Sequence, residues 1–167
     1  MAKSSSEMKR CQSAIVLGFA LTVAVAAVAL AAPIAGKWRG SNDQVPSQPL
    51  TFRVSKGAKY VLNFQPSFIV NCTKRHKPKK TVGITSDSKT NIAIHNNAFT
   101  LKGSHAQIHN GPSVYGSGTE SISGTFPHKR SALGTYSLTF TFNKSAPKGL
   151  AGYHCTTGKV HWTATHT

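Results

Sequence analysis

The stretch TYSLTFTF, Thr135–Phe142, alternates without a break between apolar and hydroxyl side chains. Every second residue is aromatic or aliphatic, and Ser or Thr occupies the positions between. A period of two, built from aromatic and β-branched residues, is typical of a β-strand with one buried face. The stretch therefore predicts a strand whose inward face carries Tyr136, Leu138, Phe140 and Phe142.

The same pattern recurs on both sides of this strand. LTFRVS (50–55) and KVHWTAT (159–165) also alternate, and NIAIHN and AFTLKG read as two short strands joined at Asn96-Asn97, where Asn tolerates a positive φ. YVLNF, SFIVNC, HAQIH and ESISGTF supply further candidates, and no long window after residue 31 has a helical period. Turn residues recur about every 8–12 positions, the spacing of a β-sandwich or barrel. We predict an all-β fold, an antiparallel sandwich or closed barrel of about eight strands.

The first 31 residues have the composition of an export signal. Lys3, Lys9 and Arg10 precede an uncharged apolar run, Ala14–Leu30, and ALAAP then offers a small-x-small cleavage site. We predict a signal peptide with a signal helix over 1–31 and a single β domain over 32–167. Because the apolar run exceeds the usual ~7–15 residues, an uncleaved membrane anchor is the alternative.

The predicted mature domain is strongly basic. The chain has 20 Lys and Arg against 4 Asp and Glu. Three of the basic residues and Glu7 lie before residue 32, so 17 basic and 3 acidic residues remain, a net charge of +14 with neutral histidines. This imbalance favours anionic partners over neutral or basic ones.

Two cysteines follow the signal peptide, Cys72 and Cys155. In an exported chain such a pair indicates a disulfide, and two free thiols are the alternative. The long loop that this bond closes would stabilise the fold by about 4.5 kcal/mol in the chain-entropy model. We expect the protein to be secreted or associated with the cell surface.

Several short motifs together resemble those of a known group of proteins. They are G-x-W-x-G at 36–40, F-x-V at 52–54, ISGTF at 122–126, GTYSLTF at 134–140 and C-x-x-G-K-V-x-W-T-A at 155–164. This arrangement is similar to that of short, uncharacterised exported proteins of high-GC Gram-positive bacteria. The resemblance implies an all-β exported domain with a Cys72–Cys155 bridge, and it carries over no catalytic residue.

The carboxylates and histidines show no catalytic or metal-binding pattern. Asp43, Asp87 and Glu120 are isolated in the sequence, and no G-x-S-x-G motif is present. A nuclease that uses Glu120 with a histidine is a minor alternative. His105 and His109 would lie about 13 Å apart on one strand, too far for one ion. We expect no enzyme activity, no cofactor and no metal.

The stretch TKRHKPKK, residues 73–80, is the most concentrated basic segment. Its fixed charges are Lys74, Arg75, Lys77, Lys79 and Lys80, and Pro78 predicts an extended loop. Such a run attracts phosphate or sulfate groups with an affinity that falls as salt rises. We predict that these five residues bind anionic polymers, namely a wall polymer, acidic polysaccharide or extracellular nucleic acid. A solvated loop without a partner is the competing interpretation.

A carrier of a small apolar ligand is the alternative function. Gly36-Lys37-Trp38 resembles the Gly-x-Trp that calyx barrels carry at the first strand. In that case the aromatic residues would line a cavity rather than fill a core. The residues concerned are Trp38, Phe52, Phe64, Phe68, Phe99, Phe126, Phe140, Phe142 and Trp162.

Overall fold

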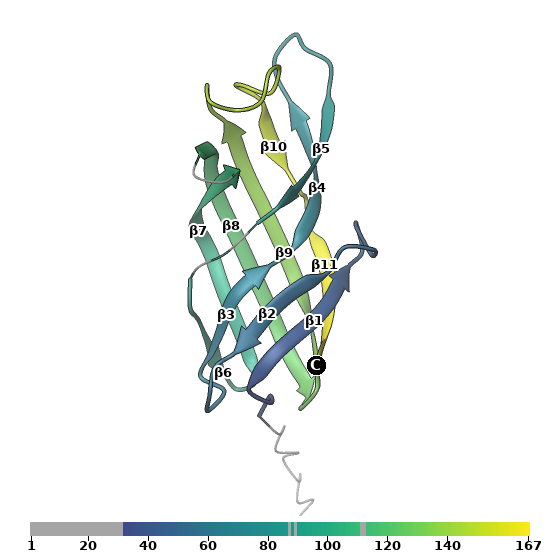
Figure 1. Cartoon of the computed structure of the whole chain (residues 1–167), viewed down its shortest axis with the longest axis vertical. Coiled ribbons are helices and arrows are strands. Elements are labelled where there is room, and N and C mark those ends of the chain that lie inside the picture. Colours follow the sequence, from purple (N-terminus) through teal and green to yellow (C-terminus); the bar gives the residue numbers. More distant parts are fainter. Residues whose placement is uncertain (1–31, 87, 89, 111–112) are drawn as a thin grey trace, which may run out of the picture.

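The computed structural model describes residues 32–86, 88, 90–110 and 113–167, which form an all-β fold (Figure 1). The predicted signal peptide and signal helix lie outside these residues. None of the described residues forms a helix that could span a membrane. The strands are β1 (Gly36–Asn42), β2 (Leu50–Val54), β3 (Tyr60–Gln65), β4 (Ser67–Thr73), β5 (Lys80–Thr85), β6 (Ile92–His95), β7 (Ala98–Asn110), β8 (Ser113–His128), β9 (Ser131–Phe142), β10 (His154–Thr156) and β11 (Val160–His166).

Eight of the strands close into an antiparallel barrel. Their order is β1-β2-β3-β6-β7-β8-β9-β11, and β11 pairs with β1 to complete the circle. The prediction of an all-β fold of about eight strands is confirmed, and of its two architectures the protein adopts the closed barrel. The Asn96-Asn97 turn is also confirmed, because both residues have positive φ (49° and 57°) between β6 and β7.

β9 pairs with two different strands along one of its edges. Its first half, Ser131–Tyr136, pairs with β11, whereas Thr139–Thr141 pairs with β10. Where the neighbours separate, the buried Thr157 exchanges hydrogen bonds with Leu138: the Leu138 amide donates to Thr157 Oγ1 (2.9 Å) and the Thr157 amide to the Leu138 carbonyl (3.0 Å). β10 continues into β4 and β5, so a three-stranded extension rises beyond the barrel (Figure 1).

Aromatic rings fill the barrel. The inward residues of the predicted strand are all buried, and Tyr136 stacks on Phe68 with ring centroids 4.0 Å apart. Trp38 stacks on Phe52 (5.6 Å), which stacks in turn on Phe64 (5.8 Å). All nine aromatic residues proposed above as a cavity lining are at most 4% exposed. Burial of this much ring surface is the main stabilising contribution.

The wall of the barrel passes very close to one of these rings. Gly134 on β9 is the register partner of Trp162 on β11. A Cβ atom at position 134 would lie 2.4 Å from the Trp162 ring and 2.0 Å from the Ser123 carbonyl oxygen. Only glycine leaves room for the indole here.

Candidate polyanion-binding site

The predicted basic segment forms the turn of the β4–β5 hairpin. β4 and β5 pair from Ser67–Thr85 to Cys72–Lys80, and the residues between Thr73 and Lys80 make the connection. The amide of Lys77 donates to the Lys74 carbonyl oxygen (3.1 Å), and His76 has a positive φ of 57°. The segment is therefore a tight, exposed loop at one end of the molecule (Figure 1).

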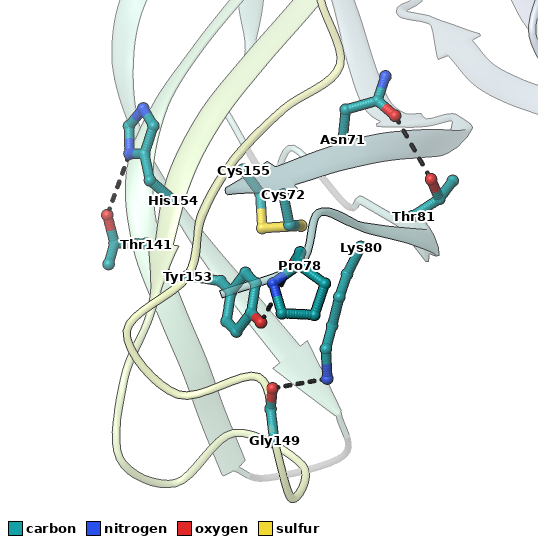
Figure 2. Close-up of a disulfide and its surroundings, with 10 residues drawn as sticks. All are labelled: Asn71, Cys72, Pro78, Lys80, Thr81, Thr141, Gly149, Tyr153, His154 and Cys155. Atoms are coloured by element: carbon teal, nitrogen blue, oxygen red, sulfur yellow. Dashed lines mark hydrogen bonds between the residues drawn. A yellow bond between two sulfur atoms is a disulfide. The ribbon is translucent and has the colours of Figure 1, made fainter. Parts of the chain in front are cut away.

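A disulfide holds this hairpin to the rest of the sheet. Cys72 on β4 and Cys155 on β10 are register partners, and their sulfur atoms are bonded as predicted (Figure 2). Both cysteines are fully buried. The bond fixes the base of the basic loop against the final part of the chain.

Two of the five predicted binding residues have structural roles. Lys74 Nζ donates to the Ala151 carbonyl oxygen (2.7 Å), and Lys80 Nζ donates to that of Gly149 (2.9 Å; Figure 2). Their ammonium groups lie 5.8 and 5.3 Å from the centroid of the Tyr153 ring, within the range of a cation–π interaction. Both lysines thus fasten the hairpin to the loop between β9 and β10.

Tyr153, on the loop between β9 and β10, makes a further contact with the hairpin loop. It is 4% exposed, and its hydroxyl donates to the Pro78 carbonyl oxygen (3.2 Å; Figure 2). The hairpin loop is therefore held by a disulfide, two lysine contacts and a tyrosine contact. Such restraint lowers the entropy that the loop loses when it binds a partner.

The remaining cations of this end are exposed. Arg75, Lys77 and Lys79 lie on the hairpin, and Lys144 and Lys148 lie on the adjoining loop. The carbonyl groups of this loop accept the hydrogen bonds from Lys74 and Lys80. We call these five exposed residues the basic end. No Asp or Glu occurs in the sequence around the hairpin loop (71–85) or around the adjoining loop (141–156).

The described carboxylates lie in different environments. Asp43 Oδ1 accepts a hydrogen bond from the His161 amide (3.1 Å). Glu120 on β8 is 3% exposed, and its Oε2 accepts from the Tyr136 hydroxyl (3.3 Å). Burial, and next the charge of Glu120, raise the pKa of Tyr136 well above its ordinary value. Asp87, the third carboxylate, lies outside the described residues.

A cleft that the sequence does not reveal lies between two sheet edges. β5 ends the extension, and β7 beyond Phe99 pairs with β8 alone. The cleft of about 760 Å³ between them is lined by Ser86, Ser88, His105, Gln107, His109 and Glu120, among others. No local sequence pattern signals this cleft, because its lining comes from segments that are distant from one another in the sequence. Among the described residues, no three His, Cys, Asp or Glu side chains form a group that could hold a metal.

Comparison with known proteins adds no functional assignment. No family model matches the chain, and neither a curated protein nor a solved structure matches it. The resemblance to exported bacterial proteins stays a prediction. The geometry of the closed barrel and its basic end therefore carries the functional argument.

Proposed function

We propose that this protein is a non-catalytic module that associates with anionic polymers through its basic end. One observation carries the proposal: the fold anchors the hairpin loop through Lys74, Lys80 and Cys72, yet leaves Arg75, Lys77 and Lys79 exposed. Lys144 and Lys148 add two more exposed charges beside them. A preformed array of cations binds phosphate or sulfate groups at a smaller entropic cost than a free tail.

The chemistry of the basic end favours recognition by charge alone. The hairpin run contains no Phe, Tyr or Trp, and Tyr153 is buried beneath it, so none of these large rings is offered there for stacking of nucleobases. The proposed partners are a wall polymer, an acidic polysaccharide or extracellular nucleic acid. The disulfide is consistent with an oxidising location, so we propose that the protein works outside the cell or at its surface.

The alternative function, carriage of a small apolar ligand, has the closed barrel in its favour. Against it, the rings that would line the cavity stack on one another instead. Detection of a bound apolar molecule by native mass spectrometry of the purified protein would support the carrier. A protein mass without ligand, in material prepared without detergent or organic solvent, would count against it.

The test compares two triple variants, one that lacks three charges of the basic end and one that lacks three charges elsewhere on the surface. The triple variant Arg75→Gln, Lys77→Gln, Lys79→Gln and the matched variant Lys56→Gln, Lys59→Gln, Lys102→Gln lose the same charge from exposed positions. We expect the first to leave a heparin resin, or a fluorescent oligonucleotide, at clearly lower salt than the second. Unchanged far-ultraviolet circular dichroism confirms that each variant folds.

Two outcomes would oppose the proposal. Equal effects of the two triple variants would show that net charge, rather than the basic end, drives association. Elution of the unmodified protein from heparin at or below about 0.1 M salt would contradict the proposal that it binds polyanions. Ions at that concentration already screen weak surface attraction.

A further inference from the structure

Three cations surround a hollow on the outer wall of the barrel, away from the basic end. Lys37 and Arg39 lie on β1 and Arg53 lies on β2, and all three are exposed. They line a hollow of about 470 Å³ together with Thr51, Asn63 and Gln65. The strands β1 and β2, which carry these cations, run side by side in the lower half of Figure 1, whereas the β4–β5 hairpin is at the top.

The strand register explains why these charges meet. Trp38 and Phe52 are register partners and point into the core, so their neighbours must point outward. Lys37 is consequently placed directly opposite Arg53, and Arg39 follows two residues later on the same face, opposite Thr51. Directly opposed residues have Cβ atoms about 4.5–5.5 Å apart, and like charges in such a pair destabilise a sheet.

Trp38 and Phe52 form the apolar part of the lining, and its remaining polar residues supply hydrogen-bond donors. Thr51 Oγ1 donates to Gln65 Oε1 (3.4 Å), which orients the Gln65 amide group so that its NH₂ can face a ligand. Asn63 adds a second amide from the irregular pairing between β2 and β3. The two guanidinium groups can each present a pair of parallel N–H donors, the geometry that matches phosphate and carboxylate oxygens.

The residue that follows β11 also belongs to the rim. Thr167 lines the hollow, and its amide donates to the Lys37 carbonyl oxygen (3.1 Å). Among the described residues that line the hollow there is no Asp or Glu side chain to offset its three positive charges. The hollow therefore keeps an excess of positive charge.

We propose that this hollow binds the phosphoryl group of a small phosphate ester. A tetrahedral oxyanion would offset the repulsion between Lys37 and Arg53 and accept hydrogen bonds from Arg39, Arg53 and Gln65. The volume exceeds that of a phosphate ion alone and falls in the ~300–1,000 Å³ range of small-molecule sites, which leaves space for the esterified part. The proposal does not depend on the basic end, because it uses none of its residues.

The experiment uses the full chain and measures binding of inorganic phosphate and of glycerol 3-phosphate by isothermal titration calorimetry in chloride buffer. We expect the ester to bind at least as tightly as inorganic phosphate, and Arg53→Gln to weaken both about tenfold, the loss typical of one charge-assisted hydrogen bond. Lys56→Gln with Lys59→Gln, a control that removes two exposed charges from the β2–β3 turn, should change the affinity less than twofold.

A second readout needs no ligand. In chloride, Arg53→Gln should leave the melting temperature unchanged or raise it, because the like-charge pair is gone. Absence of phosphate and ester binding, or an equal loss in the control, would overturn the proposal. Binding of a single-stranded oligonucleotide that depends on Arg53, without binding of either small phosphate, would also overturn it and assign the hollow to a polymer.

Discussion

At the scale of single residues, the clearest constraint is the absence of a side chain at position 134. The β9 backbone crosses the face of Trp162 so closely that a methyl group has no space. Gly83 on β5 is different, since a Cβ atom there would meet nothing within 4 Å. The two glycines therefore form a matched pair for substitution.

We predict that Gly134→Ala destabilises the fold by about 1–3 kcal/mol or more, the usual cost of overpacking a core. Gly83→Ala should stay within about 0.5 kcal/mol of the unmodified protein, as surface substitutions generally do. Urea denaturation followed by tryptophan fluorescence measures both. A stable Gly134→Ala variant would mean that the wall and the indole separate easily.

The buried phenol of Tyr136 leads to a prediction about alkaline stability. Its pKa is raised in the folded state above the ordinary value of 10.0, because burial and the neighbouring Glu120 disfavour the phenolate. The neutral phenol thus contributes stability that is complete below about pH 10 and is lost as pH rises above it, since only the unfolded chain ionises there. The slope for one proton is about 1.4 kcal/mol per pH unit.

Tyr136→Phe should consequently lose less stability than the unmodified protein between pH 10 and pH 11. Tyr60, which is 43% exposed, provides the control. Tyr60→Phe should retain the full alkaline loss. Urea midpoints at pH 8, 10 and 11 test the pair, and identical pH slopes in all three proteins would contradict the assignment.

At the scale of elements, the hairpin of β4 and β5 depends on a bond to β10. The sequence separation of Cys72 and Cys155 is 83 residues, so the bond restricts the unfolded chain over half of its length. We predict that replacing both cysteines by serine lowers the free energy of unfolding by about 2–5 kcal/mol. Reduction of the unmodified protein with dithiothreitol in mild denaturant should reproduce the loss. Unchanged stability in both experiments would contradict the prediction.

Strands with a strict period of two could be predicted from sequence. TYSLTFTF and KVHWTAT lie in β9 and β11, because a half-buried strand alternates apolar and polar residues in its sequence. β8 was predicted only in part, as ESISGTF, although it extends from Ser113 to His128. Its first half contains Gly116 and Gly118, which lie so close to the backbone of β9 that a Cβ atom would collide with it. Glycines at these positions interrupt the alternation of apolar and polar residues by which a strand is predicted.

The site was predictable where it is local and hidden where it depends on register. The exposed loop at 74–79 follows from its proline and its charges. The structural roles of Lys74 and Lys80 depend on carbonyl groups about 70 residues away. The cluster of Lys37, Arg39 and Arg53 depends on which residue of β1 faces which residue of β2, which composition cannot specify.

At the scale of the whole molecule, the excess of positive charge governs association. We predict that the logarithm of the binding constant for a single-stranded oligonucleotide falls linearly with the logarithm of salt concentration, with about 0.7 units of slope for each phosphate contacted. The triple variant Arg75→Gln, Lys77→Gln, Lys79→Gln should reduce that slope by about 2. Fluorescence anisotropy at 50–300 mM NaCl measures the slope, and a value independent of salt would contradict association by charge.

The pairing of β1 with β11 has a consequence for the order of events during synthesis. The first strand of the barrel needs the last one, so closure waits until residues 160–166 have left the ribosome. Ribosome-bound chains halted at Lys159 should accordingly be cut rapidly by protease, whereas released chains should resist it. Because domains fold as units and non-local pairings form slowly, the growing chain exposes the aromatic faces of β1 and β2 for the whole of translation. The barrel therefore stays open, and its inner rings stay without their final neighbours, until the last strand has been made.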